Sequence, residues 1–308
     1  DSEFCTSVLT TIDDMTPKPQ DIFFNKLLDF ISKSGLGAKF SEQLLGVMIR
    51  NKVKASLVTF NTLLDLYISQ RNFQMANYLF DSLQKNRDPG PDSFTFCIMI
   101  SGVKHMRKPD ADRATELFNM YKEKQRVDLI VVNCLLDVYI SLGQKNLALK
   151  LVSDLTSEYE LKPDEVTFNT LIKDSARRGA LAEAELQFEK MKSLGLKPSR
   201  ITYNSLMDIC SKGGDLAKAL SYLKQMQASG TQPDQYSYAI VFNGLKTNVS
   251  DKRVYTQTFA HLENLLEGGE FTPDEICFNT IMDVAAKFED IERVESLFKR
   301  MKTLDIKP

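Results

Sequence analysis

Asparagine recurs at one place along this chain, with a period of 35 or 36 residues that lengthens once towards the C-terminal end. A side-chain amide carries both hydrogen-bond donors and an acceptor, so it can pair with a group that presents both kinds of atom. Holding this residue type fixed while its neighbours vary indicates selective hydrogen-bond recognition. The asparagines concerned are Asn25, Asn61, Asn133, Asn169, Asn204 and Asn279.

The residues around each asparagine repeat as well. EVTFNTLIKDSARRGALAEAELQFEKMKSLGLKPS (165–199) and RITYNSLMDICSKGGDLAKALSYLKQMQASGTQPD (200–234) align over 35 residues. A fixed period of this length predicts a stacked array of one supersecondary unit rather than a globular core. Starting each repeat four residues before the asparagine position gives repeats 1 to 8 as 21–56, 57–92, 93–128, 129–164, 165–199, 200–234, 235–274 and an incomplete 275–308, after the second helix of a truncated repeat at 1–20.

Each repeat reads as an antiparallel pair of helices. Apolar residues recur at helical spacing in both halves, and Gly occupies the fifteenth place of several repeats, where a left-handed residue would end the first helix. A pair of this kind cannot bury its faces alone. We therefore expect an all-α solenoid, twisting right or left, with its concave surface lined by the first helices. The glycines are Gly35, Gly143, Gly179 and Gly214, and prolines that stop the second helix are Pro19, Pro91, Pro163, Pro198, Pro233, Pro273 and Pro308.

Composition narrows the class of function. The net charge of −2 argues against a protein that grips polyanions through bulk charge. No run of 18 apolar residues occurs, so we expect no membrane span. The five cysteines lack C-x-x-C spacing, which favours reduced thiols that fill space in helices over a metal or disulfide set. Because the chain lacks an initiator Met and stops one residue short of a full repeat, we expect a fragment of a longer protein.

Two families of stacked helical pairs fit the period. The tetratricopeptide pattern has a Trp near the start of its first helix and a 34-residue period, whereas this chain has no Trp and longer repeats. VTFNTLI…G…EAE..FE.MKS.GLKPS instead resembles the pentatricopeptide repeat consensus of the P type, over about residues 16–308. The resemblance implies a right-handed superhelical α-solenoid of helix-turn-helix repeats that binds single-stranded RNA at one base per repeat.

In that family the fifth and last residues of a repeat face one base. The resemblance implies uracil for Asn with Asp, a pyrimidine leaning to cytosine for Asn with Ser, and a target of roughly 5′-(C/U)-U-N-U-C-U-N-(C/U)-3′. Cys97 and Ala239 depart from the pattern, which leaves base choice open in repeats 3 and 7. The implied pairs are Asn25 with Ser56, Asn61 with Asp92, Cys97 with Asp128, Asn133 with Asp164, Asn169 with Ser199, Asn204 with Asp234, Ala239 with Asp274, and Asn279 with a residue beyond 308.

The second residue of every repeat is apolar. The resemblance implies that these residues clamp each base from either side. From periodicity alone, a core position on the first helix is the alternative interpretation. The residues are Ile22, Val58, Phe94, Ile130, Val166, Ile201, Tyr236 and Ile276.

The thirteenth place is basic in five repeats. A regular line of positive charge suits a phosphate backbone, while a solvated helix end that complements the helix dipole is an equal alternative. The phosphate candidates are Lys33, Arg177, Lys212 and Lys287, with His105 at the same place. Acidic residues at the ninth place would temper non-specific RNA binding, and these are Asp29, Asp65, Asp137, Asp208 and Asp283.

The chain carries no signature of catalysis. It has no H-x-E with C-x-x-C, no clustered carboxylates and no triad partners for His105 or His261, so we expect neither enzyme activity, cofactor nor metal. The leading hypothesis is a sequence-selective RNA-binding protein of a mitochondrion or chloroplast, acting in RNA stabilisation, processing, editing or translation, with other RNA-processing proteins as further partners. The alternatives are a protein-binding scaffold within a ribonucleoprotein and the RNA-recognition arm of an RNA-processing enzyme.

Overall fold

Helices alone make up the regular structure of the part that the computed structural model describes, namely residues 7–8, 11–12, 15, 19–34, 38–85, 90–248, 252–267 and 274–306. The predicted all-α class is confirmed. The first helices of repeats 1 to 8 are α2 (Asp21–Ser34), α4 (Leu57–Ser69), α6 (Ser93–Gly102), α8 (Leu129–Ser141), α10 (Glu165–Arg177), α12 (Arg200–Lys212), α14 (Gln235–Asn248) and α16 (Glu275–Lys287). The second helices are α3 (Ala38–Arg50), α5 (Phe73–Lys85), α7 (Ala111–Lys124), α9 (Lys145–Ser157), α11 (Leu181–Ser193), α13 (Leu216–Ala228), α15 (Lys252–Glu267) and α17 (Ile291–Thr303), with a 3₁₀ turn η1 (Val103–His105) after α6.

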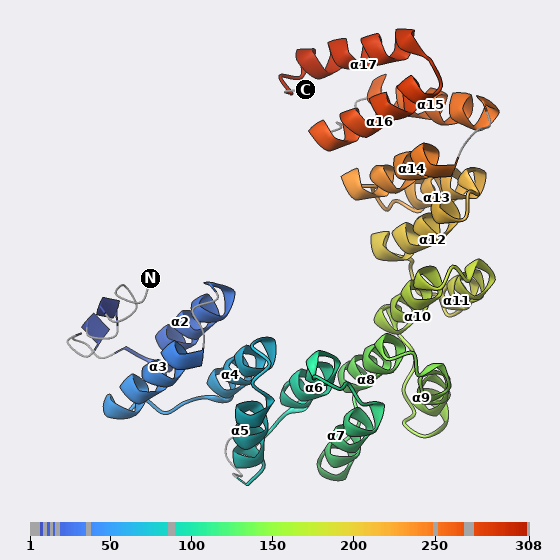
Figure 1. Cartoon of the computed structure of the whole chain (residues 1–308). Helices are drawn as coiled ribbons and strands as arrows, with labels where there is room; N and C mark the ends of the chain where they lie inside the picture. The colour runs from blue at the N-terminus through green and yellow to red at the C-terminus, as the bar shows by residue number, and fades with distance from the viewer. Residues whose placement is uncertain are drawn as a thin grey trace. The chain divides into compact units, whose positions relative to one another are not determined.

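The chain divides into an N-terminal half, 1–163, and a C-terminal half, 164–308. Within each half the first helices pack on one another in sequence order, α2, α4, α6, α8 in one and α10, α12, α14, α16 in the other (Figure 1). The first helices other than α14 also pack on their own second helices, and α15 packs on α13. Each half is thus a solenoid of stacked helical pairs, as predicted. Of the segment 1–20, only residues 7–8 and 11–12 are helical in the described part, so its assignment to a truncated repeat stays a prediction.

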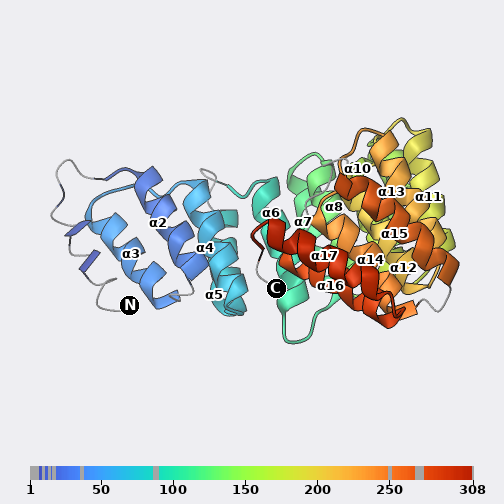
Figure 2. The ribbon, with the colours of Figure 1, turned by 90° about the horizontal axis from the view of Figure 1, so that it is seen from above.

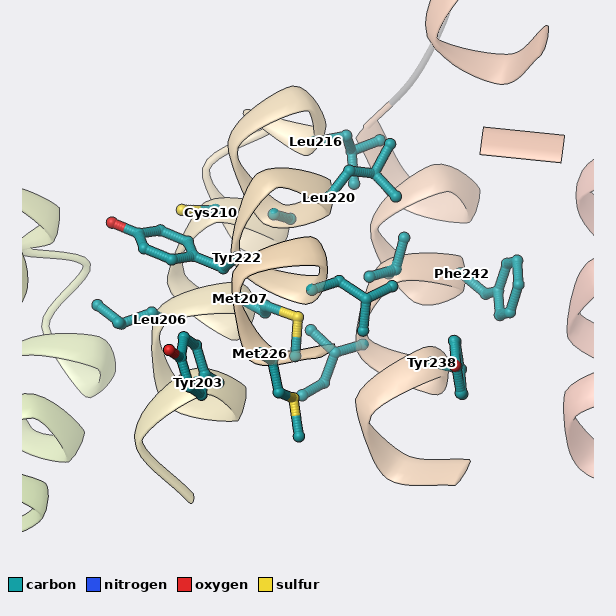
Figure 3. Packing of buried hydrophobic residues seen from close by; sticks show 14 of the residues in the cluster. Tyr203, Leu206, Met207, Cys210, Leu216, Leu220, Tyr222, Met226, Tyr238 and Phe242 are labelled. Atoms are coloured by element: carbon teal, nitrogen blue, oxygen red, sulfur yellow. The ribbon is translucent and has the colours of Figure 1, made fainter. Parts of the chain in front are cut away.

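The core of each half lies between the stacked pairs. In the C-terminal half α12 and α13 bury Leu206, Met207 and Met226 completely, and Tyr238 of α14 extends the same cluster (Figure 3). Small residues at the contact, such as Ala184 and Ala219, are fully buried and let the helices of a pair approach closely. The side-by-side helices of this half are also visible from above in Figure 2. Each buried Leu or Met side chain contributes about 1.5–3 kcal/mol through removal of apolar surface from water.

The fifteenth residue of a repeat turns the chain between the two helices. Gly143, Gly179 and Gly214 have φ of 71°, 70° and 80°, as the sequence predicts, whereas Gly35 lies outside the described residues. Arg71 and Glu289 occupy the same place with φ of 58° and 56°. The left-handed turn therefore forms at this place even where the sequence supplies a residue with a Cβ.

Cys97, Cys134, Cys210 and Cys277 form no disulfide among the described residues, and Cys5 lies outside them, so the reduced state stays a prediction. Across the described ranges, no three His, Cys, Asp or Glu side chains gather in a group that could hold a metal ion. No helix in those ranges is long and apolar enough to cross a membrane.

Candidate functional site

The second residue of each first helix points into solvent. All eight side chains are 54–73% exposed, from Val166 at the lower limit to Ile276 at the upper. The alternative interpretation of these positions as helix core is therefore wrong. Apolar side chains that stay exposed at a regular interval form a candidate interaction surface, because their exposed area contributes nothing to burial in the core.

The asparagine at the fifth place lies about one helical turn further along the same helix. Asn61, Asn133 and Asn204 are each 8% exposed, Asn25 and Asn169 are half-buried, and Asn279 is exposed. A buried amide needs hydrogen-bond partners, because each unpaired polar group costs about 1–3 kcal/mol. For Asn25, Asn61 and Asn169 the partner of the amide oxygen comes from the repeat that follows.

A threonine at the third place of the next repeat donates to the amide oxygen of the asparagine. The Oγ1–Oδ1 distances are 2.6 Å for Thr59 with Asn25, 2.8 Å for Thr95 with Asn61 and 2.6 Å for Thr202 with Asn169. This bond occupies Oδ1 and so orients the amide, leaving the Nδ2 hydrogens as the donors. The sequence pattern alone indicates no role for this threonine in orienting the asparagine.

The last residue of a repeat takes part in the same hydrogen-bond network as the asparagine at the fifth place. Nδ2 of Asn25 donates to Oγ of Ser56 across 3.3 Å, and Nδ2 of Asn169 donates to Oγ of Ser199 across 3.4 Å. In repeat 2, Oδ1 of Asp92 accepts from Oγ1 of Thr95 across 2.8 Å, and the same hydroxyl reaches Asn61. The fifth and last residues thus converge on one threonine.

The last residue also caps the helix that follows it. Oδ1 of Asp92, Asp128, Asp164 and Asp274 accepts the backbone N–H three residues later, at 2.8–2.9 Å. The recurring Asp-x-x-Thr at repeat boundaries is the capping signature that sequence inspection offers for this role. Oδ1 of each of these carboxylates is therefore engaged in helix capping, while Oδ2 of Asp128 accepts a hydrogen bond from Oγ of Ser93.

Repeat 6 departs from this arrangement. Ser237 stands at the third place of repeat 7, which holds threonine in repeats 2, 3, 5 and 6, and its hydroxyl donates to Oδ1 of Asp234 across 2.9 Å. Oδ1 of Asn204 is buried with no partner among the described residues. Burial acts to raise the pKa of Asp234, but hydrogen bonds from Ser237 and the guanidinium of Arg200 at 3.0 Å outweigh it and lower that pKa below 3.8.

The fifth residues of repeats 3 and 7 have no amide. Cys97 is buried, and its hydrogen bond with the Cys134 thiol together with burial raises the pKa of Cys97 well above that of an ordinary thiol. Ala239 is half-buried. The Ser93 hydroxyl donates to the Asp128 carboxylate, the last residue of repeat 3.

The basic residues at the thirteenth place are exposed but paired. Lys33 Nζ lies 2.6 Å from Oδ2 of Asp29, and Lys212 Nζ lies 2.7 Å from Oδ2 of Asp208. Arg177 contacts Asp174 at 3.1 Å. The ninth-place carboxylates thus neutralise part of the positive line. His105 and Lys287 are exposed as well.

The comparisons with known proteins agree with this geometry. Models of the PPR repeat family match residues 55–105, 163–212, 198–247 and 276–306, together more than half of the chain. The chain belongs to the pentatricopeptide repeat family. The family that the sequence resemblance indicated is therefore confirmed.

Curated relatives of this pentatricopeptide repeat chain come from Arabidopsis thaliana. The protein At3g09650, chloroplastic, is 24% identical over 59% of this chain and 23% of its own length, and At5g18475 is 26% identical over 54% of this chain and 33% of its own length. The matched part thus spans about a quarter to a third of these relatives. Among solved structures, maize PPR10 in complex with an 18-nucleotide psaJ RNA element has a TM-score of 0.62 at 19% identity, covering 91% of this chain and 40% of that one. Yeast Rmd9p in complex with a 16-nucleotide target RNA has a TM-score of 0.55 at 16% identity, covering 99% and 62%.

Proposed function

We propose that this pentatricopeptide repeat chain binds single-stranded RNA in a sequence-selective manner, one base per repeat, within organellar RNA metabolism. The observation that carries the proposal is the pairing, on each first helix, of an exposed apolar second residue with a fifth residue that in six repeats is an asparagine. The first is suited to contact base faces and the second to read base edges. The similar structures PPR10 and Rmd9p are named as RNA complexes, and At3g09650 is named chloroplastic.

The hydrogen-bond network supplies a physical reason for pyrimidine choice. With Oδ1 held by Thr95, Asn61 offers N–H donors, which suit a pyrimidine carbonyl oxygen. Uracil also carries an N3–H donor, and the remaining carboxylate oxygen of Asp92 accepts such a donor directly or through water. Cytosine has an unprotonated N3, which a carboxylate would repel. Ser56 and Ser199 carry no charge and can donate to that nitrogen.

The implied ligand is pyrimidine-rich, roughly 5′-(C/U)-U-N-U-C-U-N-(C/U)-3′. Each base lies between successive second residues, and the exposed basic residues Lys33, Arg177, Lys212 and Lys287 contact phosphates. With a net charge of −2, affinity comes from these local contacts rather than from the bulk field. The stacked fold itself supplies recognition, and catalysis is assigned to no residue.

Fluorescence anisotropy tests the proposal with labelled 5′-CUAUCUAU-3′ and a version in which every pyrimidine is replaced by a purine. We expect tight binding of the first only, at several salt concentrations. Asn61→Ala should weaken binding by about 1–3 kcal/mol when nucleotide 2 is uracil. The matched control is Asn119→Ala, which removes an exposed amide from α7. Equal binding of both oligomers contradicts sequence selectivity, and binding of neither favours a protein scaffold.

A further inference from the structure

Repeats 3 and 7 share a set of residues that no other repeat has. Their second residues, Phe94 and Tyr236, are the two aromatic ones among eight. Their fifth residues are the small Cys97 and Ala239. Each has Ile at the sixth place, where the other repeats carry Lys, Thr, Ser or Cys. Each also has Gly at the tenth place, where the other repeats carry larger side chains. Together with the aromatic second residue and the small fifth residue, these two places set repeats 3 and 7 apart from the other six.

Each of these repeats has a pocket against the first helix that precedes it. The pocket of repeat 3, between α4 and α6, has a volume of about 300 Å³ and is lined by Phe94, Cys97, Ile98 and Gly102. The pocket of repeat 7, between α12 and α14, has a volume of about 260 Å³ and is lined by the equivalent Tyr236, Ala239, Ile240 and Gly244. These volumes are near the lower end of the roughly 300–1,000 Å³ typical of small-ligand sites.

The glycines are required by the packing around the pockets. A Cβ on Gly102 would lie 2.7 Å from Cδ1 of Ile68, and a Cβ on Gly244 would lie 2.6 Å from Cδ2 of Leu216. Both distances are well below the roughly 3.5–4.0 Å at which non-bonded carbon atoms pack, so a side chain at either place would clash. The bare backbone lets the neighbouring helix approach, and the small fifth residue leaves open the volume that an asparagine side chain would take.

The pocket chemistry favours a large flat base. An aromatic side chain at one end stacks on a ring system, and a two-ring base offers it more surface than a one-ring base. Without an amide at the fifth place, the edge contact suited to a pyrimidine is missing. Asp65 and Asp208 line the respective pockets, and their carboxylates accept the N–H donors that purine edges present. His105 lines the pocket of repeat 3 and Lys212 lines that of repeat 7, and each is suited to contact an adjoining phosphate.

We infer that repeats 3 and 7 each accept a purine base, so that purines four nucleotides apart interrupt the pyrimidine-rich target. The inference rests on the proposed RNA binding and completes it at the two repeats where the asparagine pattern is absent.

The first test varies the base at nucleotides 3 and 7 of 5′-CUAUCUAU-3′ among A, G, C and U, using the intact chain. We expect both purines to bind about tenfold more tightly than either pyrimidine, equivalent to about 1.4 kcal/mol. The control is the same series at nucleotide 4, opposite Asn133, where a pyrimidine should be preferred. If no oligomer binds, the proposed function fails. If RNA binds but with equal affinity, or more tightly with pyrimidines at nucleotides 3 and 7, this inference alone is overturned.

The second test changes the protein. The double variant Phe94→Val with Tyr236→Val places at both second positions the valine that repeats 2 and 5 carry there. Because both sites are exposed, the variant should fold. Its preference for purines should fall at least threefold. Ile130→Val with Ile201→Val is the matched control and should leave that preference unchanged. Cys97→Asn with Ala239→Asn should reverse the preference toward pyrimidines. An unchanged purine preference in both test variants, with unchanged circular dichroism, overturns the role of these pockets.

Discussion

The hydroxyl of Thr95 donates to the amide oxygen of Asn61 across 2.8 Å and so joins the third repeat to the fifth residue of the second. The same hydroxyl lies 2.8 Å from Oδ1 of Asp92, so Thr95 contacts both the fifth and the last residue of repeat 2. Thr95 is fully buried and Asn61 is 8% exposed, so water cannot replace this contact without rearrangement. The Thr95 hydroxyl therefore links repeats 2 and 3 and orients the amide that is proposed to read a base.

Replacing that hydroxyl should affect stability and selectivity together. Thr95→Val keeps the shape but leaves buried polar groups unpaired, which should lower the free energy of unfolding by about 1–3 kcal/mol. Uracil-over-cytosine discrimination at nucleotide 2 should fall, because the amide is no longer oriented. Urea denaturation and anisotropy measure the two effects. The control is Thr62→Val, which loses a single bond to the backbone oxygen of Val58 and should change neither. Retained discrimination in Thr95→Val contradicts the orienting role.

The exposed second residues should be dispensable for folding. Ile201 is 61% exposed, so Ile201→Ser should alter the free energy of unfolding by no more than about 0.5 kcal/mol. RNA affinity should nevertheless fall, because a base loses one apolar face. Leu206→Ala, at a fully buried site on the same helix, should instead cost about 2–5 kcal/mol of stability. Thermal denaturation beside anisotropy separates the two cases, and a destabilised Ile201→Ser would argue for a core role.

The ion pair between Lys212 and Asp208 should set the salt dependence of binding. If Lys212 contacts a phosphate, Lys212→Gln should reduce the slope of log K against log[salt] by about 0.7, the value for one contact on a single strand. Asp208→Asn should raise affinity for an oligomer with a pyrimidine at nucleotide 7, where no purine edge contacts Asp208, since it removes the carboxylate that lies 2.7 Å from Nζ. Lys224→Gln, at an exposed site on α13, is the control. An unchanged slope in Lys212→Gln would favour the interpretation of a solvated helix end.

The helical pairs were predictable from sequence because their signals are local. Gly143, Gly179 and the closing prolines mark helix ends within a few residues of where they act, and the first helices begin where the repeats were divided. Exposure of Ile201 was not predictable from period alone, because an apolar residue at helical spacing fits a buried face or a recognition face equally well. The packing of neighbouring repeats decides between them.

The network around Asn61 was harder to predict for a different reason. Thr95 is 34 residues away in sequence, so the bond exists only once two repeats stack. The Asp-x-x-Thr spacing predicts a helix cap, but not that the same hydroxyl reaches back to the previous repeat. The pockets at Gly102 and Gly244 likewise depend on the approach of a neighbouring helix.

The left-handed turn at the fifteenth place predicts opposite effects of two substitutions. Gly179→Ala should lower the free energy of unfolding by about 1–2 kcal/mol, the cost of a Cβ in that conformation. Arg71→Gly should raise it by up to about 1 kcal/mol, with part of the gain offset by the extra freedom of glycine in the unfolded chain. Urea denaturation measures both. Arg178→Gly, one residue before the turn at a negative φ, serves as the control and should destabilise.

Asp290 should make the stability of the C-terminal half depend on pH. Its carboxylate caps α17 and accepts from the Tyr255 hydroxyl at 2.9 Å and from Arg293 Nη1 at 2.7 Å. Burial acts to raise the pKa of Asp290, but these bonds outweigh it and lower that pKa below 3.8. A lowered folded-state pKa means that the ionised group stabilises the fold above the ordinary value of 3.8, and that this stabilisation is lost as the pH falls through the lowered pKa.

Asp290→Asn should therefore destabilise the chain at pH 7, by about 1–3 kcal/mol for the lost charged hydrogen bonds, and the difference from the unsubstituted chain should shrink below pH 4. Urea denaturation at both pH values measures this. Asp215→Asn is the matched control, because Asp215 caps α13 through the same backbone contact at 3.1 Å. The difference in free energy of unfolding between Asp290→Asn and the unsubstituted chain could also stay constant from pH 7 to pH 3. That result would show that the shape of Asp290, rather than its charge, accounts for its contribution.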